Sequence, residues 1–270
     1  MAWFGFSAAG WVSSAIIAVV ISAALLALVC WIDDVQGLSP VTRLMAQAVA
    51  VAIGLLALPE PANLPREWVA PIAFYVAVGF IWLWWVNLYN FMDGIDGIAG
   101  SEAAAIAGGL LLFTMLGNGA DVSVALLSAA VLGASLGFLV WNWSPAKIFL
   151  GDVGSVPLGY LTGFLLIGLA GAGRWKIAMI LPLYFLADAT ITLGRRLVGG
   201  ERVWEAHRQH FYQKAVIRGL DHATVVRRVI AANLLLIACG WAAENGWAPL
   251  AFPAATAITA ALLTNLAYGR

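Results

Sequence analysis

The sequence predicts an all-α fold, a polytopic bundle of about nine transmembrane helices. Its 270 residues are 63% hydrophobic and only 10% charged, with a mean hydropathy of +0.92. An average soluble domain is roughly 45–50% apolar and about 25% charged, so this chain has too much apolar surface to bury in water. Its apolar runs are also about 20 residues long, the length a helix needs to cross a bilayer core of about 30 Å. We therefore expect residues 1–270 to form a single transmembrane domain.

The apolar runs are separated by connectors rich in turn-forming residues, such as "GLSP", "PEPANLP", "MDGIDG", "GNGAD", "WSPAK", "GAGR" and "ENGW". In the sixth run, Ser155 is a suitable helix N-cap and Pro157 suits the first turn. The predicted helices run near 10–32, 41–58, 69–90, 97–117, 122–142, 155–172, 176–197, 224–241 and 247–266.

The basic residues predict the orientation of these helices. Loops that face the cytoplasm carry the excess of Lys and Arg. One set of alternate loops holds only Arg66, Arg174 and Lys176. The other holds Arg43, Lys147, Arg195, Arg196, Arg202, Arg208, Lys214, Arg218, Arg227, Arg228 and Arg270. We therefore expect an outside N-terminus, a cytoplasmic C-terminus and a long basic cytoplasmic loop over 195–223. The formal net charge of zero gives no indication of a nucleic-acid partner.

The stretch "CWIDDVQGLSPVTR" places Asp33 and Asp34 at the end of the first helix. Two adjacent carboxylates repel each other there, and the negative end of the helix dipole repels both. A bound Mg²⁺ would offset both effects, because this ion prefers hard oxygen ligands. Two hydrated surface acids are the alternative, and this pair alone does not decide between them.

The stretch "NLYNFMDGIDGIAG" places Asn87, Asn90, Asp93 and Asp96 three residues apart at the end of the third helix. On a helix, the first three of these would line one polar flank. Asp-Gly pairs also form ordinary turns. A turn does not explain the two asparagines, because polar groups within a membrane helix are costly and usually functional. We therefore favour a functional site.

The stretch "WNWSPAKIFLGDVGSVPLGY" places Asp152 in a glycine-flanked loop before a helix. Free N–H groups at a helix start favour phosphate. Glycine-rich loops are weak signals alone, but this is a further carboxylate on the predicted cytoplasmic face.

The basic loop contains "HRQHFYQ", with His207, Arg208 and His210 in a short cluster. A zinc site is disfavoured, because neither a Cys nor a suitably spaced third His lies nearby. An anchor that follows the positive-inside rule explains part of this loop, and phosphate binding is the functional interpretation. Asp188 is the acid placed deepest within a predicted span, and structural and catalytic roles are both open for it.

These four motifs, in this order and on one membrane face, resemble the polyprenyl-phosphate N-acetylhexosamine-1-phosphate transferase family over about residues 10–220. That family includes the phospho-MurNAc-pentapeptide translocases and the undecaprenyl-phosphate GlcNAc-1-phosphate transferases. The form "HRQHFYQ" is similar to the O-antigen and capsule branch. The resemblance implies transfer of an N-acetyl amino sugar-1-phosphate from a UDP-sugar to undecaprenyl phosphate, with release of UMP, at the start of cell-envelope glycan assembly. It also implies Mg²⁺, with Mn²⁺ as an alternative ion, a bacterial inner-membrane location and a homodimer as one option.

The resemblance further implies roles for individual residues. Asp33 and Asp34 would activate the lipid phosphate, Asp34 and Asp152 would hold the metal, and Phe149 would stack on uracil. His207 and His210 would contact the diphosphate and sugar. The remaining expected site residues are Asp96 as a catalytic group, and Asn87, Asn90, Asp93, Lys147 and Arg208 as substrate-binding groups.

One departure from the family pattern concerns the start of the chain. Family members usually begin with two further helices joined by a loop of the form "PTPRGGG", which supplies basic and glycine contacts to the site. Here the chain starts almost directly at the helix that carries Asp33 and Asp34. We therefore expect a fragment, a misplaced start or a reduced homologue, and an inactive truncated homologue is an alternative to the enzyme.

Three other functions fit the sequence less well than the transferase. A transporter or lipid flippase would place its site near the bilayer midplane, often within inverted repeats. Here the acids cluster at one edge and no internal repeat is evident. A CDP-alcohol phosphotransferase would carry "DG-x-x-A-R", and "DGIDGIAG" has no Arg after Ala99. A non-catalytic membrane protein would not explain so many unpaired acids.

Overall fold

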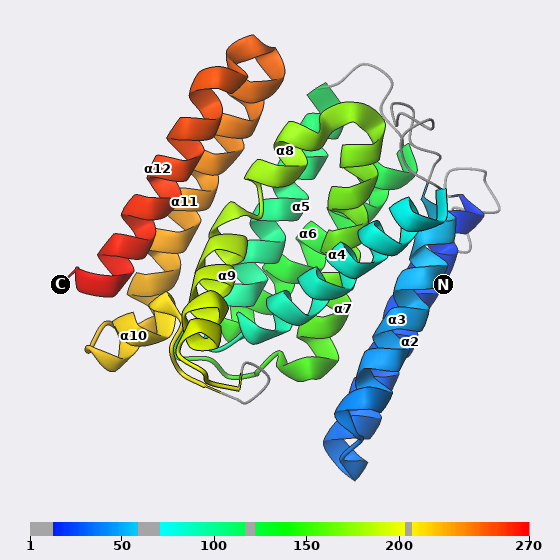
Figure 1. Ribbon diagram of the computed structural model, residues 1–270, viewed down its shortest axis with the longest axis horizontal. Coiled ribbons are helices and arrows are strands. Elements are labelled where there is room, and N and C mark those ends of the chain that lie inside the picture. Colours follow the sequence, from blue (N-terminus) through cyan, green and yellow to red (C-terminus); the bar gives the residue numbers. More distant parts are fainter. Residues whose placement is uncertain (1–12, 59–70, 117–121, 203–206, 270) are drawn as a thin grey trace.

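The computed structural model describes residues 13–58, 71–116, 122–202 and 207–269. The regular secondary structure within these ranges is entirely helical, which confirms the predicted all-α class. Two short π-helical segments, Ala170–Arg174 and Ala243–Trp247, join neighbouring α-helices. The α-helices (Figure 1) are α2 (Ser14–Gln36), α3 (Pro40–Ala57), α4 (Pro71–Phe91), α5 (Ile98–Leu116), α6 (Val122–Asn142), α7 (Gly151–Leu169), α8 (Trp175–Ile180), α9 (Leu183–Val198), α10 (Phe211–Ile217), α11 (His222–Ala242) and α12 (Ala248–Tyr268).

The described part of the chain contains seven segments that are long and apolar enough to cross a membrane. The protein is therefore a multi-pass membrane protein, as predicted. One segment, Gly151–Ile180, contains α7 and α8. Another, His222–Tyr268, contains α11 and α12, which turn back on each other at Asn245 and Gly246 (Figure 1). The predicted count of nine crossings and the predicted orientation stay predictions.

Three predicted boundaries differ from the structure. Helix α7 begins at Gly151, so Ser155 is buried within the helix and does not cap it. The predicted helix 176–197 is divided into α8 and α9, because Pro182 lacks the N–H that would continue α8. The predicted loop 195–223 includes the end of α9 and all of α10. The first and third errors come from judging helix ends by composition, whereas the second comes from not treating Pro182 as a helix breaker.

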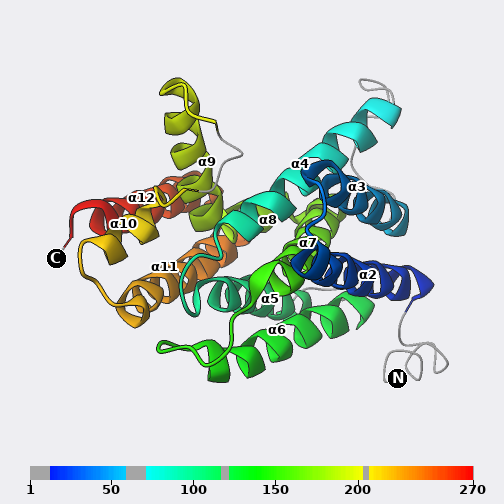
Figure 2. The same cartoon turned by 90° about the horizontal axis from the view of Figure 1, so that it is seen from below.

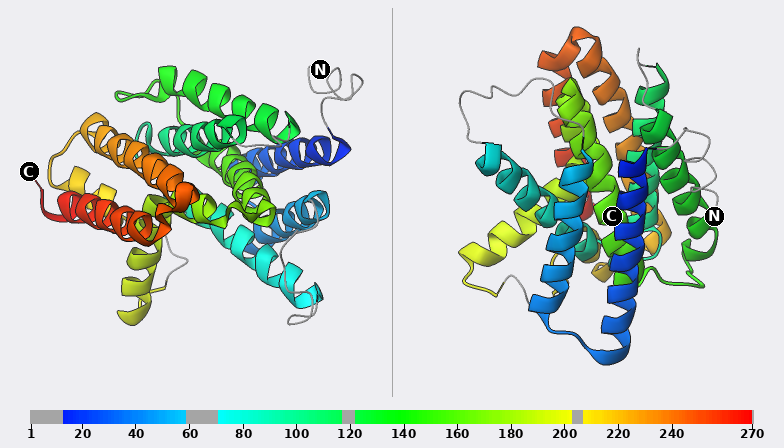
Figure 3. Two further views of the ribbon diagram at one scale, coloured as in Figure 1. Left: turned by 90° about the horizontal axis from the view of Figure 1, so that it is seen from above. Right: turned by 90° about the vertical axis from the view of Figure 1, so that its right-hand side faces the viewer.

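Helices α2 and α3 form an antiparallel hairpin with a short, well-defined turn (Figure 3). Gly37 ends α2 with a φ of 70°, a left-handed conformation that glycine adopts without strain. The Ser39 hydroxyl accepts a hydrogen bond from the Thr42 N–H at 3.1 Å, and Pro40 occupies the first turn of α3. This turn fixes the end of α2, which carries Asp33, relative to the start of α3.

Helices α4 and α7 pack against each other in the centre of the bundle. The Trp82 ring of α4 stacks on the Tyr160 ring of α7 with 5.0 Å between centroids, and its Nε1–H donates to the Tyr160 carbonyl oxygen at 3.1 Å. Both side chains are fully buried, as are Tyr89 on α4 and Tyr184 on α9. This packing places the C-terminal end of α4 beside the N-terminal end of α7.

The motif-bearing segments 33–43, 87–97, 143–155 and 207–222 gather at one end of the bundle, hereafter the polar end (the lower end in Figure 1). The C-terminal ends of α2, α4 and α9 reach this end, and α3, α7 and α11 start from it (Figure 2). The alternation of helix directions therefore brings distant parts of the sequence to one end of the bundle.

Candidate active site

Asp33 and Asp152 meet at the polar end through a shared arginine. Asp33 lies in the last turn of α2 and Asp152 in the first turn of α7. Arg43, in the first turn of α3, places Nη1 3.2 Å from Asp33 Oδ2 and 3.6 Å from Asp152 Oδ2. The structure therefore brings these two aspartates together, although about 120 residues separate them.

The adjacent residues Asp33 and Asp34 have different surroundings. Asp33 Oδ1 accepts a hydrogen bond from the Leu38 N–H at 2.6 Å, and its other oxygen accepts from Arg43. Asp33 thus organises the α2–α3 turn and orients Arg43. Asp34 is exposed and makes neither a hydrogen bond nor an ion pair with the described residues. Asp34 is therefore the acid of this pair whose oxygens are free to meet a ligand.

Asn90 connects the end of α4 to the start of α7. Its Nδ2 donates to Asp152 Oδ1 and to Ser155 Oγ, both at 2.8 Å. The amide thus orients the Asp152 carboxylate, whose other oxygen faces Arg43. Ser155 belongs to this connection, which explains why it lies inside α7 and not at its N-cap.

Asn87 lies one turn before Asn90 and serves a different contact. Its Nδ2 donates to the side-chain Oε1 of Gln47 on α3 and to the Leu83 carbonyl oxygen, both at 2.8 Å. Gln47 is buried, so this pair satisfies polar groups between α3 and α4. The two asparagines of the predicted polar flank therefore have different partners, and only Asn90 contacts Asp152 in the structure.

Asp93 follows the end of α4 and lies half-buried beside the same cluster. Burial raises the pKa of its carboxyl from 3.8 to about 7, and the negative charge of Asp152 adds to the effect. Burial disfavours the charged form, and a like charge disfavours it further. The charge of Asp152 thus acts on the Asp93 carboxyl.

Asp96 belongs to a second cluster. Its Oδ2 lies 3.2 Å from His222 Nδ1 and accepts a hydrogen bond from the Ala146 N–H at 3.1 Å. His222 begins α11, so Asp96 connects that helix to the 143–150 loop. The structure therefore gives Asp96 a role in holding this loop, and its predicted catalytic role stays a prediction.

The 143–150 loop carries two predicted substrate-binding residues. Lys147 Nζ lies 5.4 Å from the Trp141 ring centroid, within the range of a cation–π contact. Phe149 is 79% exposed. An exposed aromatic ring next to a site is available for stacking on a flat ligand.

The segment 207–213 packs its second histidine against Asp188. His210 is 1% exposed, and its Nδ1 lies 3.1 Å from Asp188 Oδ1. The His207 and His210 rings are 4.9 Å apart. Partial burial and the neighbouring His210 lower the pKa of His207 from 6.5 to about 4. Arg208 is exposed. Asp188 thus has a direct structural connection to the histidine motif.

The donor set at the polar end fits a magnesium ion that binds together with a substrate. Within the described ranges, no group of three or more His, Cys, Asp or Glu side chains could hold a metal ion by itself. Mg²⁺ usually binds through one or two carboxylates, substrate phosphates and water, so it does not need such a group. Asp152 and Asp93 provide two mutually repelling carboxylates, and the exposed Asp34 is the other predicted ligand.

Four residues of these clusters were missed by motif reasoning. Arg43 was counted only as a basic loop residue, and Ser155 only as a cap. Gln47 and His222 were given no role. Arg43 could have been found from its place in the first turn of the helix that follows the Asp33–Asp34 turn, where its side chain faces the helix that carries those acids. The other three act through contacts between helices that have no local signature.

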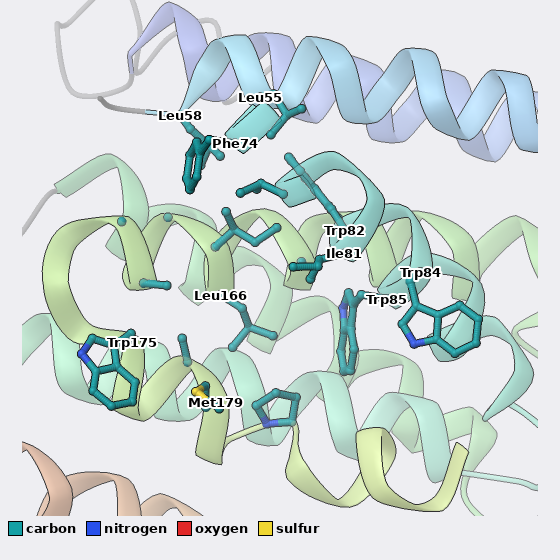
Figure 4. A pocket seen from close by; sticks show the side chains of 18 of the residues that line it. Leu55, Leu58, Phe74, Ile81, Trp82, Trp84, Trp85, Leu166, Trp175 and Met179 are labelled. Carbon is teal, nitrogen blue, oxygen red and sulfur yellow. The ribbon is translucent and has the colours of Figure 1, made fainter. Parts of the chain in front are cut away.

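An apolar pocket of about 700 Å³ lies among α3, α4, α7, α8 and α9 (Figure 4). Trp82, Trp84 and Trp85 line it from α4, and Trp175 and Met179 line it from α8. Almost all of its lining is apolar, and it lies within segments that are apolar enough to cross a membrane. The same α4 that lines this pocket continues to Asn90 at the polar end.

Comparison with known proteins places this arrangement in a family. A family model described as glycosyl transferase family 4 matches residues 16–170, more than half of the chain. The phospho-N-acetylmuramoyl-pentapeptide-transferase of Synechococcus sp. (strain RCC307) is 36% identical over 166 residues, covering 58% of this chain and 45% of that protein. The protein of the same name from Corynebacterium efficiens is 32% identical over 200 residues, covering 67% and 53%. This chain thus spans about half the length of these curated relatives. It belongs to glycosyl transferase family 4.

Proposed function

We propose that this protein transfers a sugar-1-phosphate from a UDP-linked amino sugar to a polyprenyl phosphate in the membrane, with release of UMP. One observation carries the proposal: Asp33, Arg43, Asn90, Asp93 and Asp152 gather at the end of a bundle that also contains a large apolar pocket. An enzyme that joins a lipid-dissolved phosphate to a water-soluble nucleotide sugar needs both features side by side.

The apolar pocket supports a polyprenyl acceptor. Its tryptophan lining offers large flat surfaces but few hydrogen-bonding groups, which suits an unsaturated hydrocarbon chain. Trp85 and Asn90 both lie on α4. Trp85 lines the pocket, and Asn90 contacts Asp152 at the start of α7. Five residues of α-helix correspond to a rise of about 7.5 Å. A lipid with its chain in the pocket can thus present its phosphate at the polar end.

The reaction that we propose is an in-line displacement at the β-phosphorus of the UDP-sugar. An oxygen of the lipid phosphate forms a new bond to this phosphorus. The bond from the same phosphorus to the bridging oxygen breaks, and UMP leaves with that electron pair. Both reactants are anions, so the site must chiefly supply positive charge and positioning.

Arg43 and the exposed basic residues Lys147 and Arg208 would supply positive charge at the polar end. The Arg43 guanidinium is held by two carboxylates, and its remaining N–H groups can bind a phosphate in the fork geometry typical of arginine. Asn90 and Asp33 orient the groups that meet the substrate. A carboxylate of Asp33 or Asp34 would accept a proton if the lipid phosphate arrives protonated.

Mg²⁺ is the expected cofactor, and Asp152 and Asp34 are the residues that would hold it, together with substrate phosphates and water. When bound, it would neutralise charge that develops on the phosphate oxygens. Mn²⁺ has the same preference for oxygen ligands and is an alternative. His207 and His210 would contact the diphosphate and sugar, and Phe149 would stack on uracil.

The relatives suggest one candidate for the transferred group. Both are named phospho-N-acetylmuramoyl-pentapeptide-transferases, which favours phospho-N-acetylmuramoyl-pentapeptide as the group moved. The motif "HRQHFYQ" favours the O-antigen and capsule branch, with a simple N-acetyl amino sugar. A panel of UDP-sugars distinguishes these, because only the correct donor releases UMP at an acceptor-dependent rate.

The test is a UMP-release assay with the purified chain in lipid, UDP-sugar, undecaprenyl phosphate and Mg²⁺. We expect release that requires both the acceptor and the ion, and a loss of about 100-fold or more in Asp152→Asn, the size of effect seen when one electrostatic group of a site is removed. Glu244→Gln, which changes an exposed acid of the α11–α12 turn, is the matched control and should retain activity.

Two results would overturn the proposal, and a third would remove the role of one residue. No UMP release with any donor, in a chain that binds nucleotide, indicates an inactive homologue. Acceptor transport across vesicles without UMP release indicates a flippase. Unchanged turnover in Asp152→Asn removes this carboxylate from the chemistry.

A further inference from the structure

Asp188 is an aspartate whose surroundings exclude it from direct ligand binding. It lies on α9 and is fully buried. Its Oδ1 accepts from the His210 ring at 3.1 Å, the Phe211 N–H at 3.0 Å and the Thr192 hydroxyl at 3.3 Å. Its Oδ2 accepts from the Tyr212 N–H at 3.4 Å and the Tyr184 hydroxyl at 3.5 Å. Both oxygens are therefore already occupied by donors.

Most of these donors come from one short stretch of chain. The His210 ring and the Phe211 and Tyr212 N–H groups approach Asp188 from a segment that lies 22 to 24 residues further along. The side chain of Gln213 accepts from the His210 N–H at 3.2 Å, at the start of α10. The carboxylate therefore holds the histidine motif in a set place on the bundle.

The contact with Asp188 also determines which ring nitrogen of His210 remains free. The carboxylate oxygen also accepts from the Phe211 N–H and the Thr192 hydroxyl, so an Nδ1–H that donates to it fits this cluster of donors and leaves Nε2 as the other ring nitrogen. Nε2 is buried and has no hydrogen-bond partner among the described residues. Buried polar atoms without partners are unusual in folded proteins, and each one calls for an explanation. A phosphate oxygen of a substrate would supply the missing partner once Nε2 also carries a proton.

The same segment rests on the loop that carries Asp93. The Tyr212 hydroxyl donates to the Phe91 carbonyl oxygen at 3.4 Å. A side-chain carbon added at Gly94 would collide with this hydroxyl, so the segment lies directly on the loop backbone. The position of His210 is thus tied both to Asp188 and to the aspartate loop.

We propose that Asp188 is a positioning residue for the transfer reaction: its carboxylate holds the Nδ1–H of His210 and thereby presents Nε2 to a phosphate oxygen of the substrate. When the ring is protonated, Nε2–H donates to that oxygen, and the buried carboxylate stabilises the positive charge. This inference rests on the proposed function. The titratable and charged groups around this cluster are Asp93, Glu102, Tyr184, Arg195, Arg196, Glu201, His207 and Tyr212.

The first experiment compares Asp188→Asn, His210→Gln and the double variant in the UMP-release assay. Replacing the partner that orients a functional imidazole commonly costs on the order of 10- to 100-fold. We expect a kcat loss of this size in each single variant and no further loss in the double variant, because Asp188 acts through His210. Additive losses, or full activity in Asp188→Asn, would overturn the inference.

The pH profile separates positioning from a merely structural role. The limb of kcat that depends on His210 should move to lower pH in Asp188→Asn, because a nearby carboxylate favours the protonated ring. A variant that only loosens the bundle would lower kcat without moving this limb. Thr259→Val is the matched control, since it makes the same change at a buried threonine of α12, outside this cluster, and should leave both the rate and the profile unchanged.

A measurement on the unaltered protein keeps the inference testable if Asp188→Asn does not fold. The chain has only three histidines, so nitrogen-15 NMR of labelled ring nitrogens can be assigned by comparison with His210→Gln. We expect a protonated Nδ1 in His210. A spectrum that shows an unprotonated Nδ1 overturns the inference, even if the protein has transferase activity. If the protein is inactive but shows the expected spectrum, only the proposed function is wrong.

Discussion

Asp152 and Asp188 both lie at the polar end, but their surroundings differ. Asp152 belongs to a partly exposed cluster with Asn90 and Arg43, hereafter the open region. Asp188 belongs to a buried cluster with His210 and its neighbours, hereafter the closed region. Asp152 is partly exposed and contacts Asn90 and, at 3.6 Å, Arg43. Asp188 is fully buried and accepts hydrogen bonds from five groups. A carboxylate with spare lone pairs can take a metal ion or a substrate, whereas a saturated one can only hold its neighbours in place.

The difference shows that a cluster of acidic residues does not by itself define a ligand-binding site. Asp33 and Asp34 repeat the lesson within two adjacent residues, because one organises a turn and the other is exposed. Accessibility and unfilled acceptor capacity separate a ligand-binding carboxylate from a positioning one. The comparison therefore predicts opposite responses to mutation in the two regions.

The largest expected effect is on stability. Removing one partner of a buried charged pair costs about 3–5 kcal/mol, so Asp188→Ala should lower the free energy of unfolding by about that much. Asp152→Ala removes a partly exposed ion pair and one hydrogen bond, and should cost less than about 2 kcal/mol. Thermal unfolding of both variants in one detergent measures the contrast. Equal losses would mean that the two aspartates do not differ as described.

The second prediction concerns Arg43 in the open region. Arg43→Met keeps much of the side-chain volume but removes the shared cation between Asp33 and Asp152. Half-exposed ion pairs contribute about 0–1 kcal/mol to stability, so the melting temperature should change little. UMP release should fall about 100-fold, as expected for the loss of a cation that stabilises a phosphoryl-transfer transition state. A variant that melts early but turns over normally would make Arg43 structural.

The sequence was sufficient to predict the helical membrane fold and the convergence of three motifs, for a physical reason. Apolar run length is set by the bilayer, and helix alternation sends the ends of the first and third predicted helices and the start of the sixth to the same side. Asp33, Asn90 and Asp152 could therefore be placed together without knowledge of any contact.

The sequence was not sufficient to predict which polar groups pair. Asn87 binds Gln47 while Asn90 binds Asp152, although both lie on one flank of α4. That division depends on how α3 and α7 cross α4, and helix crossing angles are set by side-chain packing over the whole interface. The pairing of Asp96 with His222 joins residues 126 positions apart and follows from the same kind of packing.

The third prediction concerns the apolar pocket, which α7 connects to Asp152 in the open region. A side-chain carbon at Gly163 would lie 2.5 Å from the Trp82 ring, so Gly163→Ala must displace a tryptophan that lines the pocket. Gly171 also lines the pocket, but a carbon there meets nothing within 4 Å, which makes Gly171→Ala the matched control. We expect the KM for polyprenyl phosphate to rise about tenfold in the first variant only, the scale of one misplaced apolar group. A change in the KM for the UDP-sugar instead would separate the pocket from the acceptor.

The smallest expected effect is a pH dependence of stability at the edge of the closed region. Partial burial and the neighbouring His210 lower the pKa of His207 from 6.5 to about 4, so the folded state favours the neutral ring. Between these two values the unfolded chain binds the proton more readily. The contribution of His207 is therefore fully present above pH 6.5 and is lost as the pH falls towards 4. We expect the melting temperature to fall between pH 7.5 and pH 5 by less in His207→Gln than in the unaltered protein. An identical fall in both proteins would mean that His207 titrates normally. His207 would then not belong to the buried cluster around Asp188, and His210 would be its outermost histidine.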